Sequence, residues 1–162
     1  MSLRWHVINA RNEVVIDEGW EWCMFANRQL LYFRENGKEG LFDWREQKVV
    51  LKPMFKTIHG LEDSVLVVEA ERSYLIDLSG RRISKDTFRH VRSFVDGLAA
   101  ASEVEGGPYG FINHAGEWVI RPRFYHVTDF TEGLSVAMDD SGKEFYIDRH
   151  GDTVIKGPFD SA

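Results

Sequence analysis

Six histidines and one cysteine are the side chains of this 162-residue chain best suited to metal binding or nucleophilic chemistry. His90 and His126 each stand two residues after a phenylalanine, and Trp22 and Thr57 occupy the same place after two other rings. A position that also accepts Trp and Thr is not a ligand position, and no cysteine or carboxylate lies nearby at ligand spacing. We therefore predict no metal site and no cofactor.

The sequence also offers little to a catalytic mechanism. Cys23 occupies a position held elsewhere by Ile58, Val91 and Val127, which indicates a small buried hydrophobe rather than a nucleophile. There is no glycine-rich phosphate loop, nucleophile elbow or paired-histidine motif, and residues 106–108 (GGP) are typical of a hairpin tip. We predict no catalytic residues and no enzymatic activity.

The elements that would position these side chains recur with a fixed period. An apolar residue followed by Asp or Asn marks each hairpin, at steps of 34, 34, 36 and 35 residues. These apolar residues are Ile8, Phe42, Ile76, Ile112 and Ile147. Further along each unit stands a large ring, at Trp20, Phe55, Phe88, Phe124 and Phe159. Apolar or small residues follow each of the first four rings at the third and sixth positions, as in Phe88/Val91/Phe94. A fixed period with matching chemistry at each position indicates a repeat protein.

The turns between the repeated segments favour strands over helices. Residues 77–80 (DLSG), 113–116 (NHAG) and 148–151 (DRHG) each combine Asp or Asn with a glycine three residues later. This pattern is typical of a type I turn followed by a residue with positive φ, which closes a hairpin. The equivalent residues 43–47 lack glycine and have one extra residue, so a looser turn is expected there.

The predicted fold is all-β: tandem repeats of about 35 residues, built of short antiparallel strands and hairpins that form one curled sheet. A closed barrel or a small propeller is the alternative. We expect a single domain, 1–162, of four to five units with about three strands each and with the ring triplets buried between units. It has a partial first unit (1–17), an off-pattern segment (18–28) that could host a helical turn, and a partial last unit (147–162) capped by Phe159. Strands are expected at 29–34, 40–43, 48–51, 64–69, 73–77, 81–84, 98–103, 109–113, 117–120, 134–138, 144–148 and 153–156.

Three segments resemble the WG-repeat family, also called KWG repeats. They are residues 37–43 (GKEGLFD), 109–113 (YGFIN) and 130–134 (FTEGL), and the likeness is closest over 94–160, intermediate over 37–93 and weakest over 1–36. The tryptophan that names the family is absent, and its place holds Glu39, Ser73, Tyr109 and Phe145. The resemblance implies a β-repeat architecture and lends no single activity.

Charge and composition narrow the classes of partner and compartment. The net charge of −6 argues against a nucleic-acid partner, because phosphate contacts need clustered Lys and Arg. The single cysteine suits a reducing compartment. No apolar run approaches the roughly 20 residues of a membrane helix, and the first residues contain no apolar signal region. We expect a soluble cytoplasmic protein without a membrane partner.

Charges are distributed unevenly between the two kinds of hairpin tip. The hairpin tips that follow the strands expected at 29–34, 64–69, 98–103 and 134–138 form what we call the acidic edge. It carries Glu35, Glu39, Glu69, Glu71, Glu103, Glu105, Asp139, Asp140 and Glu144, against Arg34, Lys38, Arg72 and Lys143. The other tips and their following strands carry Arg11, Arg45, Lys48, Arg81, Arg82, Arg121, Arg123 and Arg149. The predicted partner-binding residues are Glu103, Glu105, Asp139 and Asp140, together with Trp20 and Trp22. Trp20 holds a ring position and is expected in the core, whereas Trp22 and Trp44 are expected to be exposed.

These features predict a non-catalytic protein–protein interaction module that binds a basic protein. A specific form is an immunity or inhibitor protein that neutralises a basic bacterial toxin. Two alternatives stay open: tip charges that only maintain solubility, and a small-ligand-binding protein or enzyme with a pocket near residues 18–28. The oligomeric state is not predicted.

Overall fold

The computed structural model describes residues 5–8 and 10–156, and within these ranges the chain forms strands and no helix. Sheet 1 holds β1 (Trp5–Ile8) and β2 (Val14–Trp20), and sheet 2 holds β3 (Trp22–Phe25), β4 (Leu30–Glu35), β5 (Lys38–Asp43) and β6 (Lys48–Phe55). Sheet 3 holds β7 (Thr57–Glu62), β8 (Val65–Glu69) and β9 (Tyr74–Asp77). Sheet 4 holds β10 (His90–Val91), β11 (Ala99–Ser102), β12 (Tyr109–Ile112) and β13 (Trp118–Phe124). Sheet 5 holds β14 (His126–Val127), β15 (Ser135–Met138), β16 (Glu144–Ile147) and β17 (Thr153–Lys156).

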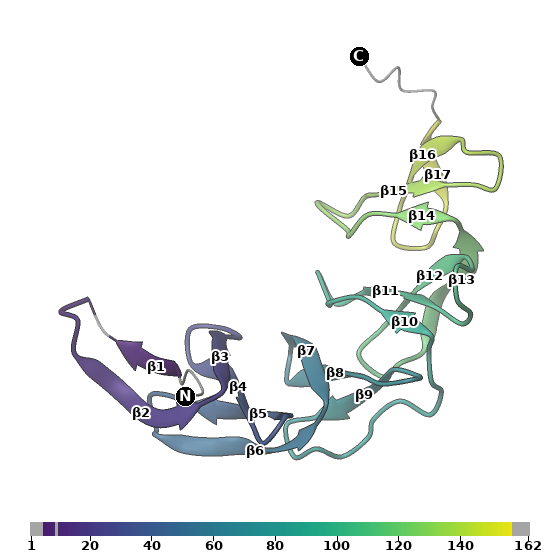
Figure 1. Ribbon diagram of the computed structural model, residues 1–162. Coiled ribbons are helices and arrows are strands. Elements are labelled where there is room, and N and C mark those ends of the chain that lie inside the picture. Colours follow the sequence, from purple (N-terminus) through teal and green to yellow (C-terminus); the bar gives the residue numbers. More distant parts are fainter. Residues whose placement is uncertain (1–4, 9, 157–162) are drawn as a thin grey trace.

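The five sheets follow one another along an open arc, with sheet 1 and sheet 5 at opposite ends (Figure 1). Each sheet is an antiparallel meander in which every strand pairs with its neighbour in sequence. The prediction of an all-β repeat fold is therefore confirmed, and the described strands form no closed barrel. The expectation of one curled sheet is corrected, because the strands form five separate sheets that follow one another along the arc. Single residues (Glu21, Lys56 and Tyr125) carry the chain from one sheet to the next at three of the four junctions.

The helical turn considered for residues 18–28 is wrong. Residues up to Trp20 complete β2, and Trp22–Phe25 form β3, which pairs with β4 from Trp22↔Arg34 to Phe25↔Leu31. β3 occupies the same place in its unit as β7, β10 and β14. This strand follows the ring in each unit, so sheets 2, 4 and 5 have four strands each instead of about three.

The strand expected at residues 81–84 is also wrong, because a side chain replaces one of its backbone hydrogen bonds. Only an isolated bridge joins Ile76 and Arg82 in this segment. Two residues later the Ser84 hydroxyl oxygen accepts the hydrogen bond donated by the Leu75 N–H, at 3.1 Å. Sheet 3 therefore ends after three regular strands.

The core lies between successive sheets, where the ring triplets are buried. Phe88, Val91 and Phe94 pack with Val65, Val67 and Leu75 of sheet 3 and with Ala99, Ala101 and Ile112 of sheet 4. Phe124, Val127 and Phe130 pack with Phe111 and Ile120 of sheet 4, with Leu98 just before β11, and with Ala137 and Ile147 of sheet 5. The triplet of Phe55, Ile58 and Leu61 is confirmed only in part, since Ile58 is buried and both flanking residues are half-buried. Phe159 lies outside the described residues.

The predicted turns are confirmed. In the turn that begins at Asp77, the carboxylate accepts the Ser79 N–H at 2.9 Å and Gly80 adopts a φ of 82°. Asn12 (φ 62°) and Gln47 (φ 52°) adopt positive φ at the corresponding places in the copies without glycine. The acidic edge contains the same kind of turn at residues 139–142, which the sequence interpretation did not identify.

A buried carboxylate joins sheet 2 to the edge of sheet 3. Glu39 is 3% exposed, pairs with the Arg34 guanidinium and accepts the Ile58 N–H at 2.8 Å. The hydroxyl of buried Tyr32 accepts the Leu61 N–H at 3.0 Å. These two acceptors satisfy outward-facing N–H groups of edge strand β7, which would otherwise lack partners. The assignment of Glu39 to the exposed acidic edge is therefore wrong.

The same junction predicts a pH dependence of stability. Burial lowers the pKa of His59 below its ordinary value of 6.5, although Glu69 and Glu39 oppose this effect. As the pH falls below about 6.5, His59 becomes protonated in the unfolded chain while it is still neutral in the folded chain. The free energy of unfolding therefore decreases as the pH drops. Urea unfolding at about pH 7.5 and about pH 5.5 should show a larger loss for the wild type than for His59→Gln. Equal losses would show that another group carries the dependence.

No helix in the described part of the chain has the length and apolarity needed to cross a membrane.

Candidate functional site

The acidic edge runs along the hairpin tips that join the second and third strands of the sheets. Glu103 and Glu105 lie on the β11–β12 tip, and both are exposed. The Glu105 carboxylate pairs with Arg89 and lies 3.4 Å from His90 Nε2. The hydrogen bond from Arg89, followed by that from His90, lowers the pKa of Glu105. Of these two acids, Glu103 is the one whose carboxylate is not engaged in an ion pair among the described residues.

Neighbouring tips along this edge are held against one another. Arg72, on the β8–β9 tip, donates a hydrogen bond from Nη1 to the carbonyl of Glu103 at 3.3 Å. Arg89 donates from Nη1 to the carbonyl of Glu71 at 2.9 Å. The equivalent tips of sheets 3 and 4 are thus side by side, as the repeat pattern predicts.

Asp139 and Asp140 lie on the β15–β16 tip, and their roles differ. The Asp139 carboxylate accepts the Ser141 N–H at 3.0 Å, the Ser141 hydroxyl at 2.7 Å and the Lys143 N–H at 3.0 Å. These bonds, with that from the Ser141 hydroxyl first, lower the pKa of Asp139. Asp139 therefore stabilises its own turn, whereas Asp140 is exposed.

The two predicted tryptophans lie at the junction of sheets 1 and 2. Trp20 is 5% exposed, and its ring centroid lies 4.6 Å from that of Phe33 and 5.0 Å from that of Phe42. Its expected place in the core is confirmed. The expectation that Trp22 is exposed is wrong: it is half-buried, and Arg34 lies over its ring at 5.9 Å. Trp44 is also half-buried, and its indole N–H donates to the Arg28 carbonyl.

Three open grooves, which we call ring grooves, lie beside Trp20, Phe55 and Phe124 in the described part of the chain. The Trp20 groove measures about 560 Å³, the Phe55 groove about 560 Å³ and the Phe124 groove about 390 Å³. Each is lined by its ring, two acidic side chains and one basic side chain. These charged residues are Glu18, Glu35 and Lys52 for the first groove, Glu69, Glu71 and Lys56 for the second, and Asp139, Asp152 and Arg123 for the third.

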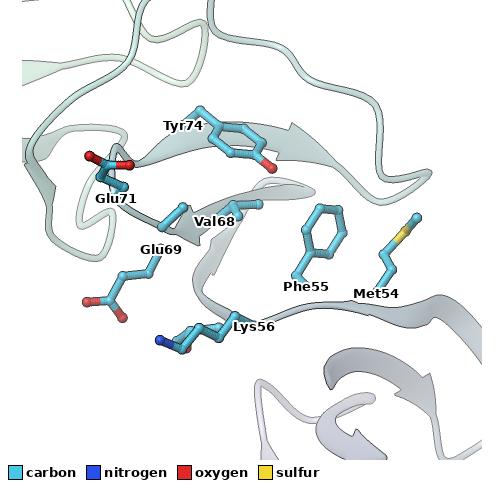
Figure 2. A pocket seen from close by; sticks show the side chains of 9 residues that line it. Met54, Phe55, Lys56, Val68, Glu69, Glu71 and Tyr74 are labelled. Atoms are coloured by element: carbon cyan, nitrogen blue, oxygen red, sulfur yellow. The ribbon is translucent and has the colours of Figure 1, made fainter. Parts of the chain in front are cut away.

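Figure 2 shows the Phe55 groove from close by. Glu69 and Glu71 lie on one side, Phe55 and Met54 lie on the other, and the Tyr74 ring lies near Phe55. Val68 is buried, whereas both glutamates and Lys56 are exposed. The arrangement combines an aromatic surface with negative charge, which suits a cationic group.

The Trp20 groove coincides with the place of the pocket considered for residues 18–28. Its lining includes Glu18, Trp20 and Glu35 and contains no histidine, cysteine or serine. Nearby Cys23 is half-buried, and burial raises the pKa of its thiol, which favours the unreactive protonated form. The described residues contain no group of three or more His, Cys, Asp or Glu side chains that could hold a metal ion.

The sequence interpretation did not select the residues that line the Phe55 groove as a site. Glu69 and Glu71 belong to the acidic edge, and Phe55 holds a ring position, but these were treated as separate features. The repeat spacing contained a usable signal, because in each unit the ring precedes the acidic tip by a similar interval. Tyr74 carried no such signal.

Comparison with known proteins identifies a repeat in this chain. Residues 109–142 match the family model described as the WG containing repeat, which confirms the resemblance seen in the sequence. No curated protein matches the sequence significantly.

Several solved structures resemble the fold. The computationally designed protein Ika8 superposes with a TM-score of 0.59 at 11% identity, over 90% of this chain and 52% of its own. Hsv2 from Kluyveromyces marxianus gives 0.59 at 10% identity, over 100% of this chain and 61% of its own. BamB from Moraxella catarrhalis gives 0.51 at 12% identity, over 96% and 55%. This chain therefore spans about half the length of Ika8 and BamB. At such identities the likeness shows the fold alone.

Proposed function

We propose that this chain, which carries a WG-containing repeat, is a non-catalytic protein-interaction module whose acidic edge binds a basic protein. The observation that carries the proposal is the lateral alignment of equivalent tips through Arg72 and Arg89. This alignment brings the tips that bear the exposed Glu71 and Glu103 next to each other.

The charge of such an edge would act mainly on the rate of association and on the choice of partner. A row of like charges on a rigid support raises the local potential and steers an oppositely charged protein toward it. The net charge of −6 adds to this field. The rate of association should therefore fall steeply with added salt.

A specific form of this function is an immunity or inhibitor protein that neutralises a basic bacterial toxin in the cytoplasm. The acidic edge would cover the cationic surface with which a nucleic-acid-cleaving toxin binds its substrate. If so, expression of the isolated partner alone in a bacterial host should arrest growth, and co-expression of this chain should restore it. A partner that does not impair growth would exclude the inhibitor role and leave the interaction role in place.

A small-ligand-binding function is the second candidate, favoured by the Trp20 groove beside residues 18–28. The two candidates predict different material after capture from the source cell. A stoichiometric basic protein supports the interaction module, whereas a retained metabolite without a protein supports the ligand-binding function.

Reversing the charge of acidic side chains tests whether the acidic edge is the interface with the partner. The edge variant Glu71→Lys/Glu103→Lys/Asp140→Lys leaves Asp139 and Glu105 intact, because these two acids have partners within the chain. The control variant Asp86→Lys/Asp129→Lys/Glu132→Lys changes three exposed acids elsewhere and raises the net charge equally, from −6 to 0. The edge variant should lose the captured partner while the control retains it. Equal retention at low salt would reject the acidic edge as the interface.

A further inference from the structure

We propose that the Phe55 groove is a binding site for an arginine side chain presented by the partner. This inference rests on the proposed function and identifies the group that the acidic edge receives. The groove is lined by residues of the β6–β7 junction and of β8, β9 and the tip between them, so it opens beside the acidic edge.

The composition of the groove favours a cation. Phe55 and Tyr74 offer ring surface, and Glu69 and Glu71 offer carboxylates across from Phe55 (Figure 2). Lys56 contributes the only positive charge among the lining residues, so two acids face one base. Among the described residues neither glutamate carboxylate forms a hydrogen bond or an ion pair, and both therefore remain available to a guest.

The chain's own contacts indicate that the guest is arginine. Every cation found over an aromatic ring among the described residues is a guanidinium: Arg34 over Trp22, Arg45 over Trp44, Arg82 over Tyr74, Arg92 over Tyr109, Arg123 over Phe124 and Arg149 over Phe130. A guanidinium stacks on a ring and meets a carboxylate with two parallel donors, which an ammonium cannot do. Since Arg82 already lies over Tyr74 at 5.2 Å, Phe55 is the ring that a guest would cover.

Two neighbouring ring positions show how such a guest would be held. Arg89 follows Phe88 directly, as Lys56 follows Phe55. The Arg89 guanidinium pairs with the Glu105 carboxylate and donates a hydrogen bond to the Glu71 carbonyl. In the Phe124 groove, Arg123 lies over the ring at 4.9 Å and donates to the Gly151 carbonyl. At both positions a guanidinium from the chain itself supplies the cation. In the Phe55 groove the equivalent residues are Lys56 and Met54, so no guanidinium comes from these positions.

The test measures binding of three short peptides by calorimetry at low and high salt: hexa-arginine, hexa-lysine and hexa-citrulline, the neutral analogue of hexa-arginine. Two variants probe the site. Phe55→Leu removes the ring and keeps an apolar side chain, and Glu71→Gln removes an exposed charge without disturbing the core. Tyr125→Leu and Asp129→Asn are the matched controls, since both residues are exposed and neither lines the groove.

Hexa-arginine should bind more tightly than hexa-lysine, and hexa-citrulline should not bind. Each site variant should weaken hexa-arginine binding about three- to tenfold, and the controls should leave it unchanged. Hexa-arginine should also shift the amide resonances of Thr57, Val68 and Ala70. The proposal is overturned if hexa-arginine and hexa-lysine bind alike and Glu71→Gln weakens binding no more than Asp129→Asn does, because general charge attraction then explains the result.

The outcomes separate this site from the proposed function. Peptide binding at the groove in a chain that captures no protein partner would reject the interaction function and keep the site. If a protein partner is captured and neither Phe55→Leu nor Glu71→Gln changes its affinity, the arginine site is rejected and the interaction function is retained. If Phe55→Leu fails to fold, Glu71→Gln alone decides, because its side chain is exposed.

Discussion

Phe88→Ala will lower the free energy of unfolding by roughly 3–5 kcal/mol, as expected when a fully buried ring is removed from a packed core. Phe88 is 0% exposed, packs with residues of sheets 3 and 4, and meets the Trp118 ring edge-on with centroids 5.4 Å apart. The cavity would open at the junction between sheets 3 and 4. Denaturant unfolding followed by tryptophan fluorescence measures the change.

Phe124→Ala should behave similarly, since Phe124 is 4% exposed and holds the same place one unit later. His126→Ala is the control, because this side chain is exposed and lies two residues away. Its effect should be within about 0.5 kcal/mol of zero. Similar losses for Phe124→Ala and His126→Ala would mean that the inward and outward faces have been exchanged.

Gly116→Ala has the second large expected effect, because two costs coincide at this turn. Gly116 has a φ of 78°, which costs a residue with a side chain roughly 1–2 kcal/mol. A Cβ atom there would also lie 2.6 Å from Ser84 Cβ, well inside contact distance. Overpacking of this kind adds about 1–3 kcal/mol. The total loss should be roughly 2–5 kcal/mol by denaturant unfolding.

Gly142→Ala separates the two costs. Gly142 closes the same kind of turn with a φ of 81°, but no atom lies within 4 Å of its added Cβ. This variant should therefore show the backbone cost alone. If both variants lose equal stability, the close approach of the turn to the preceding unit contributes nothing.

The local elements of the fold were predictable because their causes are local. A carboxylate or amide that binds the backbone two residues on, followed by a glycine at positive φ, specifies the turn at Asn113 as it does at Asp77. The ring triplets were predictable from spacing, since Phe88, Val91 and Phe94 must share one face. Both kinds of signal lie within a few residues of each other.

The remaining features were missed for three different reasons. Trp22–Phe25 has no alternating pattern, and its strand exists because β4 offers a free edge. Glu39 stands among exposed acids in sequence, yet it is buried because the Ile58 N–H of the next unit needs an acceptor. Asp139 was taken for an exposed binding residue because its turn lies outside the recognised turn positions.

The two sets of residues that line the candidate site, the acidic tips and the rings, were predictable only separately. The acidic tips follow from composition at one place in the repeat, and the rings follow from another. The acidic tips and the rings line one groove only because of how far each unit is rotated relative to the preceding unit. The spacing of residues in the sequence does not give this rotation. Tyr74, which stands where two other units have Gly40 and Gly110, lines the Phe55 groove for the same reason.

The exclusive pairing of each strand with its neighbour in sequence has a kinetic consequence. Within a sheet, closing each hairpin requires only a short loop, and the entropy cost is met one turn at a time. The described core clusters between sheets join residues of adjacent units, so each interface can form once two neighbouring units are in place. Chains with such local contacts fold quickly for a β protein. Folding can also start at any pair of adjacent sheets and extend in both directions, so interior sheets should protect their amide hydrogens longest and the end sheets should release them first.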